Sequence, residues 1–506
     1  MRTPEIFVSL DIGTTSIKVV VAEHMNGQVN IIGVGNEKSR GLSRGVIVDI
    51  DETVYSIQQA IAQAEQKAQV KINDVIVGVP SNKLMIDNCH GMIAVSSDTR
   101  EITEKDVNNV IMAAKVRSVP PEREIISIIP EEFIVDGFTG IRDPQGMIGV
   151  RLELYARLIT GPKTIIHNIR RCVEKAGLNI TELVVQPQAI AEVALTPDER
   201  EFGTIIVDMG GGQTSASIIY DNQLKYSFVD QEGGDFVTKD ISLILNTSLE
   251  NAERIKREFG YAVSRQTSEE EYFPVETVGR KEPVRVDERY LSEIIEARLA
   301  QIFETVRDDL EGVDALDLPG GFVLTGGAAS LPGVLELAQE YFGPKVRLYI
   351  PEQMGMRNPV FTTAIGMVEY AAGLDVVHRI AQGTYQAASA PRQDRGFERP
   401  YQETASQDVT NQPMMPPRQQ APRRPARPER QRPVAEPVSD YDAYSNLGGY
   451  ATEESNYVPE PEAGVNYDNP VPVVGNGIIS KIQAFFRTFF DWDSGGTIYG
   501  ISIWFN

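Results

Sequence analysis

The fold of this chain is decided by one stretch of sequence, IIVDMGGGQTSASII at residues 205–219. A β-branched apolar run is followed by an aspartate, three consecutive glycines and small polar residues, and then the apolar pattern resumes. Because glycine has no Cβ atom, this row of glycines allows a tight turn and a close approach of the backbone to a ligand. A hairpin tip with backbone N–H groups, hydroxyls and one carboxylate suits a phosphate with its metal ion, and a glycine-rich turn without a ligand is the alternative. The candidate residues are Asp208, Gly210, Gly211, Gly212, Gln213 and Thr214.

A second copy of this design lies near the N-terminus, in DIGTTSIK at residues 11–18. A short strand again ends in a carboxylate, a glycine and two hydroxyls, and a lysine follows that can neutralise a phosphate oxygen as a point charge. An ordinary hairpin with a salt-bridged lysine is the alternative. The candidate residues of this copy are Asp11, Gly13, Thr14, Thr15 and Lys18.

The two copies indicate an internal repeat, since each is followed by a strand meander and a helix. Two α/β halves that face each other across a cleft would place both glycine turns around one triphosphate. Asp11 and Asp208 would then hold Mg²⁺ mainly through water, because this ion gives up its hydration shell reluctantly. A third turn, TGGAA at residues 325–329, would lie against the base and sugar, where small residues allow close approach. The further candidate residues are Gly233, Gly234, Gly326, Gly327 and Ala328.

Composition and motifs exclude several classes of protein. The chain has 506 residues and a net charge of −23, which argues against a nucleic-acid partner because phosphate backbones are bound by a basic field. Cys89 and Cys172 fit neither a disulfide scaffold nor a zinc site. The patterns GxxxxGK[ST] and GxGxxG are absent, so P-loop and dinucleotide-binding folds have no support. No secretory signal and no stretch of about 18 apolar residues is seen, so we expect a cytoplasmic protein.

Hydrophobic periodicity predicts the elements of the core and an insertion. A helix over residues 51–69 would be capped by Asp49 or Asp51, and a long amphipathic helix is predicted over 287–310. Residues 84–161 differ from the repeated core and predict an inserted α/β subdomain. Its predicted elements are strands at 92–95, 125–130, 132–135 and 151–159 and a helix at 107–114.

The C-terminal part of the chain changes in composition. Residues 386–475 are rich in Pro, Gln, Arg and Ser without apolar periodicity, which indicates a flexible linker. Residues 476–492 then place large apolar side chains on one face of a predicted helix, which is marginal in water but stabilised in a bilayer interface. Docking on a protein surface is the alternative, and residues 493–506 have no firm explanation. The predicted membrane-facing residues are Ile478, Ile479, Lys481, Ile482, Phe485, Phe486, Arg487, Phe489, Phe490 and Trp492.

Three turn sequences, DIGTTSIK, VDMGGGQTS and LTGGAASLPG, occur in this order, with LVVQPQAIAEVAL between the first two. Together they resemble the phosphate, connecting and adenosine motifs of the actin and heat-shock chaperone ATPase superfamily, over about residues 6–374. Within that superfamily the chain is most similar to the FtsA family of bacterial cell division proteins. The resemblance implies a two-lobed actin-like α/β ATPase fold with an inserted FtsA-type subdomain, a disordered linker and a C-terminal amphipathic helix. It places Lys256 at the adenosine and Gln186 where related ATPases orient the attacking water, although Gln186 in a plain strand-end turn is the alternative.

The resemblance also implies a division into subdomains. They are 1A (residues 1–83, 162–198 and 366–385), 1C (84–161), 2A (199–228 and 300–365) and 2B (229–299), followed by the linker (386–475), the membrane-targeting helix (476–492) and an atypical tail (493–506).

The function implied by the resemblance is that of an ATP- and Mg²⁺-binding protein with weak or slow ATPase activity, in which Asp11, Asp208 and Gln186 act in catalysis. It would polymerise head to tail on the cytoplasmic face of the cell membrane at the division site. Its C-terminal helix would anchor the FtsZ ring, and it would recruit later division proteins. The FtsZ contact would lie around residues 229–299. A pilus-assembly or chaperone ATPase and a small-molecule kinase of the same superfamily are the alternatives.

Overall fold

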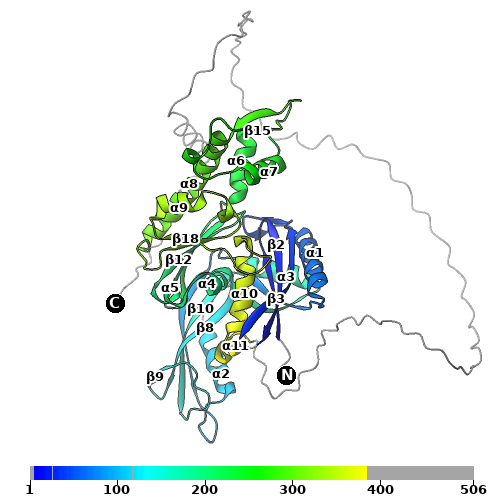
Figure 1. Ribbon diagram of the computed structural model, residues 1–506. Helices are drawn as coiled ribbons and strands as arrows, with labels where there is room; N and C mark the ends of the chain where they lie inside the picture. Colours follow the sequence, from blue (N-terminus) through cyan, green and yellow to red (C-terminus); the bar gives the residue numbers. More distant parts are fainter. Residues whose placement is uncertain (1–4, 26, 117–118, 384–506) are drawn as a thin grey trace, which may run out of the picture. The chain divides into compact units, whose positions relative to one another are not determined.

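The computed structural model describes residues 5–25, 27–116 and 119–383 of the chain (Figure 1). The predicted linker, amphipathic helix and C-terminal tail lie outside these residues. The described part contains two similar five-stranded sheets, a four-stranded third sheet inserted in the first half, two two-stranded sheets, and the helices that pack on them.

The first sheet combines an antiparallel meander with two parallel strands. The strand order is β11-β6-β1-β2-β3, and the pairs β1–β6 and β6–β11 are parallel. Successive side chains of β2 enter two different cores, because Val19 and Val21 pack on one side of the sheet and Val20 on the other. The strands are β1 (Glu5–Ile12), β2 (Ser16–Met25), β3 (Gln28–Lys38), β6 (Asp74–Val79) and β11 (Asn179–Val185).

The second sheet repeats this arrangement. Its order is β14-β13-β12-β17-β18, with β12, β13 and β14 antiparallel and β17 and β18 parallel to β12. The two first hairpins also share a register, because Asp11 pairs with Lys18 and Asp208 pairs with Ser215, seven positions further on in each case. The predicted internal repeat is therefore present in the fold. The strands are β12 (Thr204–Met209), β13 (Thr214–Tyr220), β14 (Gln223–Asp230), β17 (Phe322–Thr325) and β18 (Val346–Leu348).

Helices cover both faces of the first sheet. The helix α1 (Ile50–Ala68) begins at Asp49, whose Oδ1 accepts a hydrogen bond from the Glu52 N–H at 3.1 Å, so Asp49 is the cap. It packs with α3 (Lys163–Lys175) in one apolar cluster. On the other face lies α10 (Thr362–Gly373), which contacts α4 (Gln186–Ala194). Gly366 permits this crossing, since a Cβ atom there would lie 2.0 Å from the Ala189 carbonyl oxygen.

Helices of the second half are joined by a buried ion pair. Arg298 on α8 (Glu288–Gly312) is 3% exposed and donates to both carboxylate oxygens of Asp240 on α6 (Gly234–Ile244), at 2.6 and 3.0 Å. It also donates to Glu232 at 2.6 Å. The predicted long helix is thus confirmed as α8. The other elements of this half are α7 (Leu249–Phe259), α9 (Val334–Phe342), β15 (Tyr272–Val275) and β16 (Val284–Asp287).

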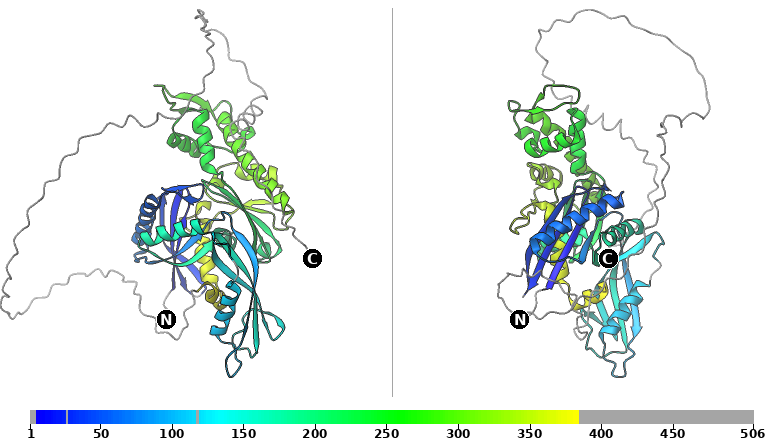
Figure 2. Two further views of the ribbon diagram at one scale, coloured as in Figure 1. Left: turned by 180° about the vertical axis from the view of Figure 1, so that it is seen from behind. Right: turned by 90° about the vertical axis from the view of Figure 1, so that its right-hand side faces the viewer.

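The third sheet has the order β7-β10-β8-β9, and Figure 2 shows α2 (Glu104–Lys115) lying along it. The prediction of two strands at 125–130 and 132–135 is wrong, because β8 is one continuous strand. Tyr155 pairs with Glu132 and Ala156 with Pro130, so the extra residue Glu131 forms a bulge beside a proline that cannot donate to the ladder. The strands are β7 (Met85–Ala94), β8 (Arg123–Val135), β9 (Phe138–Ile141) and β10 (Arg151–Pro162).

Several short elements were missed by periodicity. The helix α11 (Val376–Gln382) packs its apolar side chains with α2 and the third sheet. The strands β4 (Leu42–Ser43) and β5 (Val46–Ile47) form a small hairpin, and α5 (Pro197–Phe202) follows α4. Segments of two to seven residues are too short to establish a hydrophobic period.

Among the described residues no single helix is long and apolar enough to span a membrane. One pair, Pro359–Gly373 with Val376–Gln382, passes this test of length and composition together, but it is bent by 114°.

Replacing Arg298 by Met should destabilise the fold. The substitution leaves the buried carboxylate of Asp240 without its bidentate partner, so we expect the free energy of unfolding to fall by about 3 kcal/mol. Urea denaturation measures this change. Arg289→Met is the matched control on the same helix, because the exposed ion pairs of Arg289 should contribute less than about 1 kcal/mol. Equal losses in both variants would show that the buried pair has no special role.

Candidate functional site

The tips of the two glycine turns are in contact, with glycines of one turn against threonine side chains of the other. A Cβ atom on Gly211 would lie 1.8 Å from Thr15 Oγ1, and one on Gly212 would lie 2.7 Å from Thr14 Oγ1. Thr15 Oγ1 also lies 3.5 Å from Asp235 Oδ1, at the start of α6. The structure therefore brings the two predicted turns together, and glycine is required where they touch.

The carboxylate of Asp11 is held from both sides. Lys18 Nζ lies 3.0 Å from its Oδ2, and Gln186 Nε2 donates to its Oδ1 at 3.0 Å. Lys18 also donates to the Ser16 carbonyl oxygen at 3.3 Å, and both members of the ion pair are buried. The structure thus shows Lys18 in an ion pair with Asp11, which the sequence analysis had given as the alternative. Gln186 is the first residue of α4, so this helix positions its amide at the carboxylate.

The second carboxylate, Asp208, lies close enough to Asp11 to be influenced by its charge. Desolvation first, and then the negative charge of Asp11, raise the pKa of Asp208 to about 6, and the charge of Lys18 acts in the opposite direction. A cation between the two carboxylates would relieve this repulsion. Among the described residues no group of three or more His, Cys, Asp and Glu side chains could hold a metal ion. The two aspartates therefore fit Mg²⁺ only if water or phosphate oxygens supply the remaining ligands.

The third glycine turn borders the same place. A Cβ atom on Gly326, which has φ 93°, would lie 2.4 Å from Asp208 Oδ1. The Gly234 N–H donates to the Gly210 carbonyl at 3.0 Å, and a Cβ atom on Gly234 would lie 3.3 Å from Ala328 Cβ. A Cβ atom on Gly233 would lie 2.5 Å from the Gly210 carbonyl oxygen. The second and third turns are thus in contact through the start of α6.

Lys256 lies beside this contact but is already engaged. Its Nζ donates to the Gly234 carbonyl at 2.9 Å and to Thr238 Oγ1 at 2.7 Å, and it pairs with Glu253 at 2.6 Å. A Cβ atom on Gly327 would lie 3.5 Å from Val360 Cγ2, an ordinary van der Waals contact. The predicted membrane-facing side chains of residues 478–492 lie outside the part of the chain that the structure describes.

Two contacts at the glycine turns were missed by the sequence analysis. The Gly45 N–H, in the turn between β4 and β5, donates to Thr14 Oγ1 at 2.9 Å. Asn82, just after β6, donates from Nδ2 to Gln213 Oε1 at 2.9 Å. Neither residue belongs to a glycine-rich pattern, and only the folded chain brings them to the turns.

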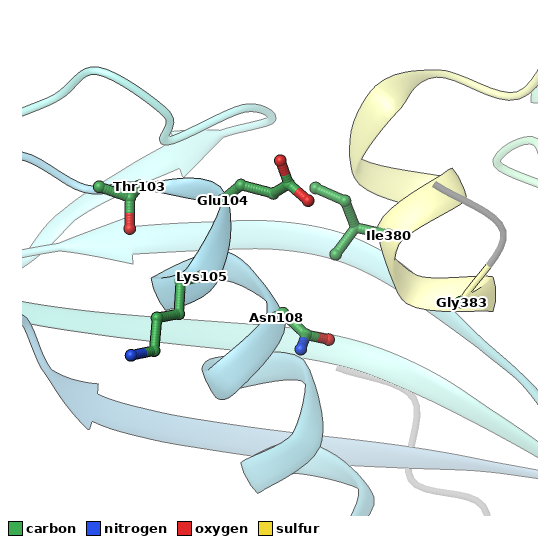
Figure 3. A pocket seen from close by; sticks show the side chains of 6 residues that line it. All are labelled: Thr103, Glu104, Lys105, Asn108, Ile380 and Gly383. Atoms are coloured by element: carbon green, nitrogen blue, oxygen red, sulfur yellow. The ribbon is translucent and has the colours of Figure 1, made fainter. Parts of the chain in front are cut away.

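A cavity of about 610 Å³ lies elsewhere, between α2 and α11, where the side chains of Glu104 and Ile380 point toward each other (Figure 3). None of the glycine-turn residues lines it. Its lining residues are Thr103, Glu104, Lys105, Asn108, Ile380 and Gly383.

Comparison with known proteins identifies the family. A family model described as cell division protein FtsA matches residues 205–366, and one for the SHS2 domain inserted in FtsA matches residues 81–160. The cell division protein FtsA of Enterococcus hirae is 60% identical over 382 residues, which cover 76% of this chain and 86% of that protein. This chain belongs to the FtsA family.

More distant relatives agree with this assignment. FtsA of Bacillus subtilis is 46% identical over 73% of this FtsA-family chain and 84% of that protein, and FtsA of Escherichia coli is 33% identical over 72% and 90%. The solved structure of a PilM-PilN type IV pilus biogenesis complex is 15% identical, with a TM-score of 0.50 and coverage of 73% and 99%. This last likeness concerns the fold alone. The FtsA-family chain has an actin-like α/β fold, as the three turn sequences predicted, with an SHS2 insertion where the pattern of residues 84–161 predicted an inserted subdomain.

The raised pKa of Asp208 predicts a pH-dependent stability. A carboxyl group whose pKa is raised on folding binds its proton more tightly in the folded state, so stability falls as the pH rises from 3.8 to about 6. Asp208→Asn removes this penalty. Without nucleotide or divalent cation, the variant should be more stable than the unchanged protein by about 2 kcal/mol at pH 7, and this advantage should vanish below pH 4.

Urea denaturation across this pH range tests the expectation. Asp308→Asn, on the exposed surface of α8, is the matched control and should follow the unchanged protein. If the free energy of unfolding depends on pH in the same way for Asp208→Asn and the unchanged protein, Asp208 is not a desolvated carboxylate repelled by Asp11.

Proposed function

We propose that this FtsA-family protein binds ATP with Mg²⁺ between its two glycine turns. The observation that carries the proposal is the juxtaposition of the turns, in which two carboxylates, Asp11 and Asp208, face one site lined by backbone and hydroxyl groups. N–H groups and hydroxyls suit phosphate oxygens, and the carboxylates suit a divalent cation that keeps most of its water. The residues that would hold the phosphates are Gly13, Thr14, Thr15, Lys18, Gly210, Gly211, Gly212, Gln213 and Thr214.

The nucleoside would lie toward the third turn. Gly326 approaches Asp208, and the start of α6 joins Gly210 to Ala328 and Lys256. Small residues at this place leave room for a flat ring against the backbone. The residues that would contact base and sugar are Gly233, Gly234, Lys256, Gly326, Gly327 and Ala328.

Hydrolysis would be slow. We propose that Gln186 orients the attacking water. Its amide nitrogen already donates to Asp11 at 3.0 Å, and an amide cannot act as a general base, so Gln186 can only position the water. Asp11 is itself paired with Lys18 and is therefore a poor base. We infer that the nucleotide mainly sets the state of an assembling protein.

At the cellular level we propose that the protein forms head-to-tail polymers that attach the FtsZ ring to the cytoplasmic face of the membrane and recruit later division proteins. The proposed subdomains 1A, 1C, 2A and 2B would provide separate surfaces for these contacts. Residues 229–299 carry several exposed apolar side chains, which supports a protein partner there. They are Leu243, Ile244, Leu249, Tyr272, Val278 and Tyr290. The helix predicted at 476–492 would bind lipid, and a polymer that presents many such helices would bind by avidity.

The family assignment favours cell division over the other candidate functions. The relatives that are 33–60% identical are cell division proteins by name. The likeness to the pilus complex is one of fold at 15% identity, so it adds no support for a pilus-assembly ATPase. A small-molecule kinase would leave the bilayer-seeking segment unexplained.

Replacing Asp208 by Asn should weaken Mg-ATP binding. The substitution removes one of the two carboxylates proposed for the hydrated cation, so we expect the Kd for Mg-ATP to rise by at least about tenfold. Isothermal titration calorimetry measures the affinity, and Asp308→Asn is again the control. An unchanged Kd would remove the glycine turn from the proposed mechanism.

A charge on the apolar face of the predicted C-terminal helix should abolish membrane binding. Phe486→Asp would place a carboxylate in the bilayer interface, whereas Thr488→Asp adds the same charge on the polar side of the predicted helix. In co-sedimentation of the full chain with vesicles that contain anionic lipid, only Phe486→Asp should stay in the supernatant. Equal binding by both variants would contradict the tether.

A further inference from the structure

Two side chains at the tips of the glycine turns can act either as hydrogen-bond donors or as acceptors. They are the hydroxyl of Thr14 and the amide of Gln213. A terminal phosphate group presents only acceptor oxygens at neutral pH, apart from residual protonation. For both side chains to bind it, each must present its hydrogens toward the ligand. Neighbouring protein groups must therefore occupy the acceptor oxygen of each side chain.

The two contacts that the sequence analysis missed do this. Thr14 Oγ1 accepts the Gly45 N–H at 2.9 Å, and Gln213 Oε1 accepts the Asn82 Nδ2–H at 2.9 Å. Within the described parts of the chain, neither Thr14 nor Gln213 donates a hydrogen bond from its side chain to another protein group. The Thr14 hydroxyl hydrogen and the Gln213 Nε2 hydrogens are therefore available to a ligand.

The local geometry indicates that these contacts serve a ligand rather than stability. Asn82 is 6% exposed, and its Oδ1 is buried without a hydrogen-bond partner among the residues described, which costs free energy in the folded state. Gly45 has φ 73°, and a Cβ atom there would lie 2.0 Å from Gln213 Oε1, so only glycine comes this close. Arg44 anchors the same turn to the second half, with its guanidinium carbon 5.4 Å from the centre of the Phe236 ring.

The position of these side chains selects one phosphate. Gly210 contacts the start of α6 and hence the side of the site proposed for the nucleoside. The Gln213 backbone closes this turn, because its carbonyl oxygen accepts the Gly210 N–H at 2.9 Å, but its side chain reaches Asn82 and the Gly45 turn, and Thr14 lies against Gly212. Both side chains thus contact the first half, whereas the third turn, proposed for the nucleoside, contacts Asp208 and Gly234. The phosphate farthest from the nucleoside is therefore the one that these donors would reach.

We propose that Gly45 and Asn82 are positioning residues that turn Thr14 and Gln213 into donors for the terminal phosphate of a nucleoside triphosphate. They give the site its preference for the triphosphate over the diphosphate. This inference rests on the proposed nucleotide-binding function and adds the residues that distinguish the two nucleotides.

Asn82→Asp is the decisive variant. A carboxylate can only accept, so Gln213 must turn its Nε2 toward residue 82 and present Oε1 to the phosphate. With Mg²⁺ present, we expect the full-length variant to bind ATP about tenfold or more weakly, while its Kd for ADP changes less than about twofold. Asn222→Asp makes the same chemical change in an exposed turn and should alter neither affinity.

A second variant separates hydrogen bonding from charge. Gln213→Leu removes the donor without adding a charge and should also lower the ratio of ATP to ADP affinity, and thermal unfolding verifies that each variant is folded. If either folded variant keeps the ratio of the unchanged protein, or loses both nucleotides by the same factor, the inference is wrong while the proposed nucleotide binding stands. If the unchanged protein binds neither nucleotide, the proposed function fails and the inference fails with it.

Discussion

The contact between two hairpin tips is the constraint on which the rest of the site depends. A Cβ atom on Gly211 would lie 1.8 Å from Thr15 Oγ1 and 3.1 Å from Thr15 Cβ, so a side chain there would displace Thr15. Each tip closes a hairpin inside a five-stranded sheet, and the strands behind it are hydrogen-bonded and buried. A tip therefore cannot move far without its sheet, because close-packed interiors do not deform continuously. This makes the contact between the turns a natural place for a ligand to control the relative position of the halves.

Electrostatics adds a second constraint at the same place. Asp11 is neutralised by Lys18 and held by Gln186, whereas Asp208 is partly buried and repelled by Asp11, which together raise its pKa to about 6. The fold thus maintains one carboxylate at a cost in stability. Such an arrangement is typical of a functional site, where a bound group supplies the missing favourable interaction. A partly hydrated cation would compensate the negative charge of the two carboxylates, and water and phosphate oxygens would supply the metal ligands that the side chains do not.

The inserted sheet shows how the family departs from a simple duplication. Its residues follow β6 and return to α3, so the insertion leaves the strand order of the first sheet intact. Its core is closed by α2 and by α11, which arrives from the far end of the described chain. A Thr103 capping box starts α2. The insertion is therefore packed against a helix of its own, α2, and against α11, while the nucleotide turns remain in the repeated core.

The sequence by itself determined the repeat, the three turns and the family, because these rest on local patterns. Alternating and consecutive apolar residues specify strands, a row of glycines specifies a turn, and an aspartate before an amphipathic run specifies a helix start, although the choice of Asp49 over Asp51 came from the structure. It did not resolve whether Lys18 is salt-bridged, and it missed Gly45 and Asn82 altogether. Lys18 pairs with Asp11 seven positions away, and Gly45 contacts Thr14 within the same half at 31 positions, whereas Asn82 meets Gln213 across the two halves at 131 positions. Only the folded arrangement of these segments decides which donor meets which acceptor, and hence what each turn can offer to a ligand.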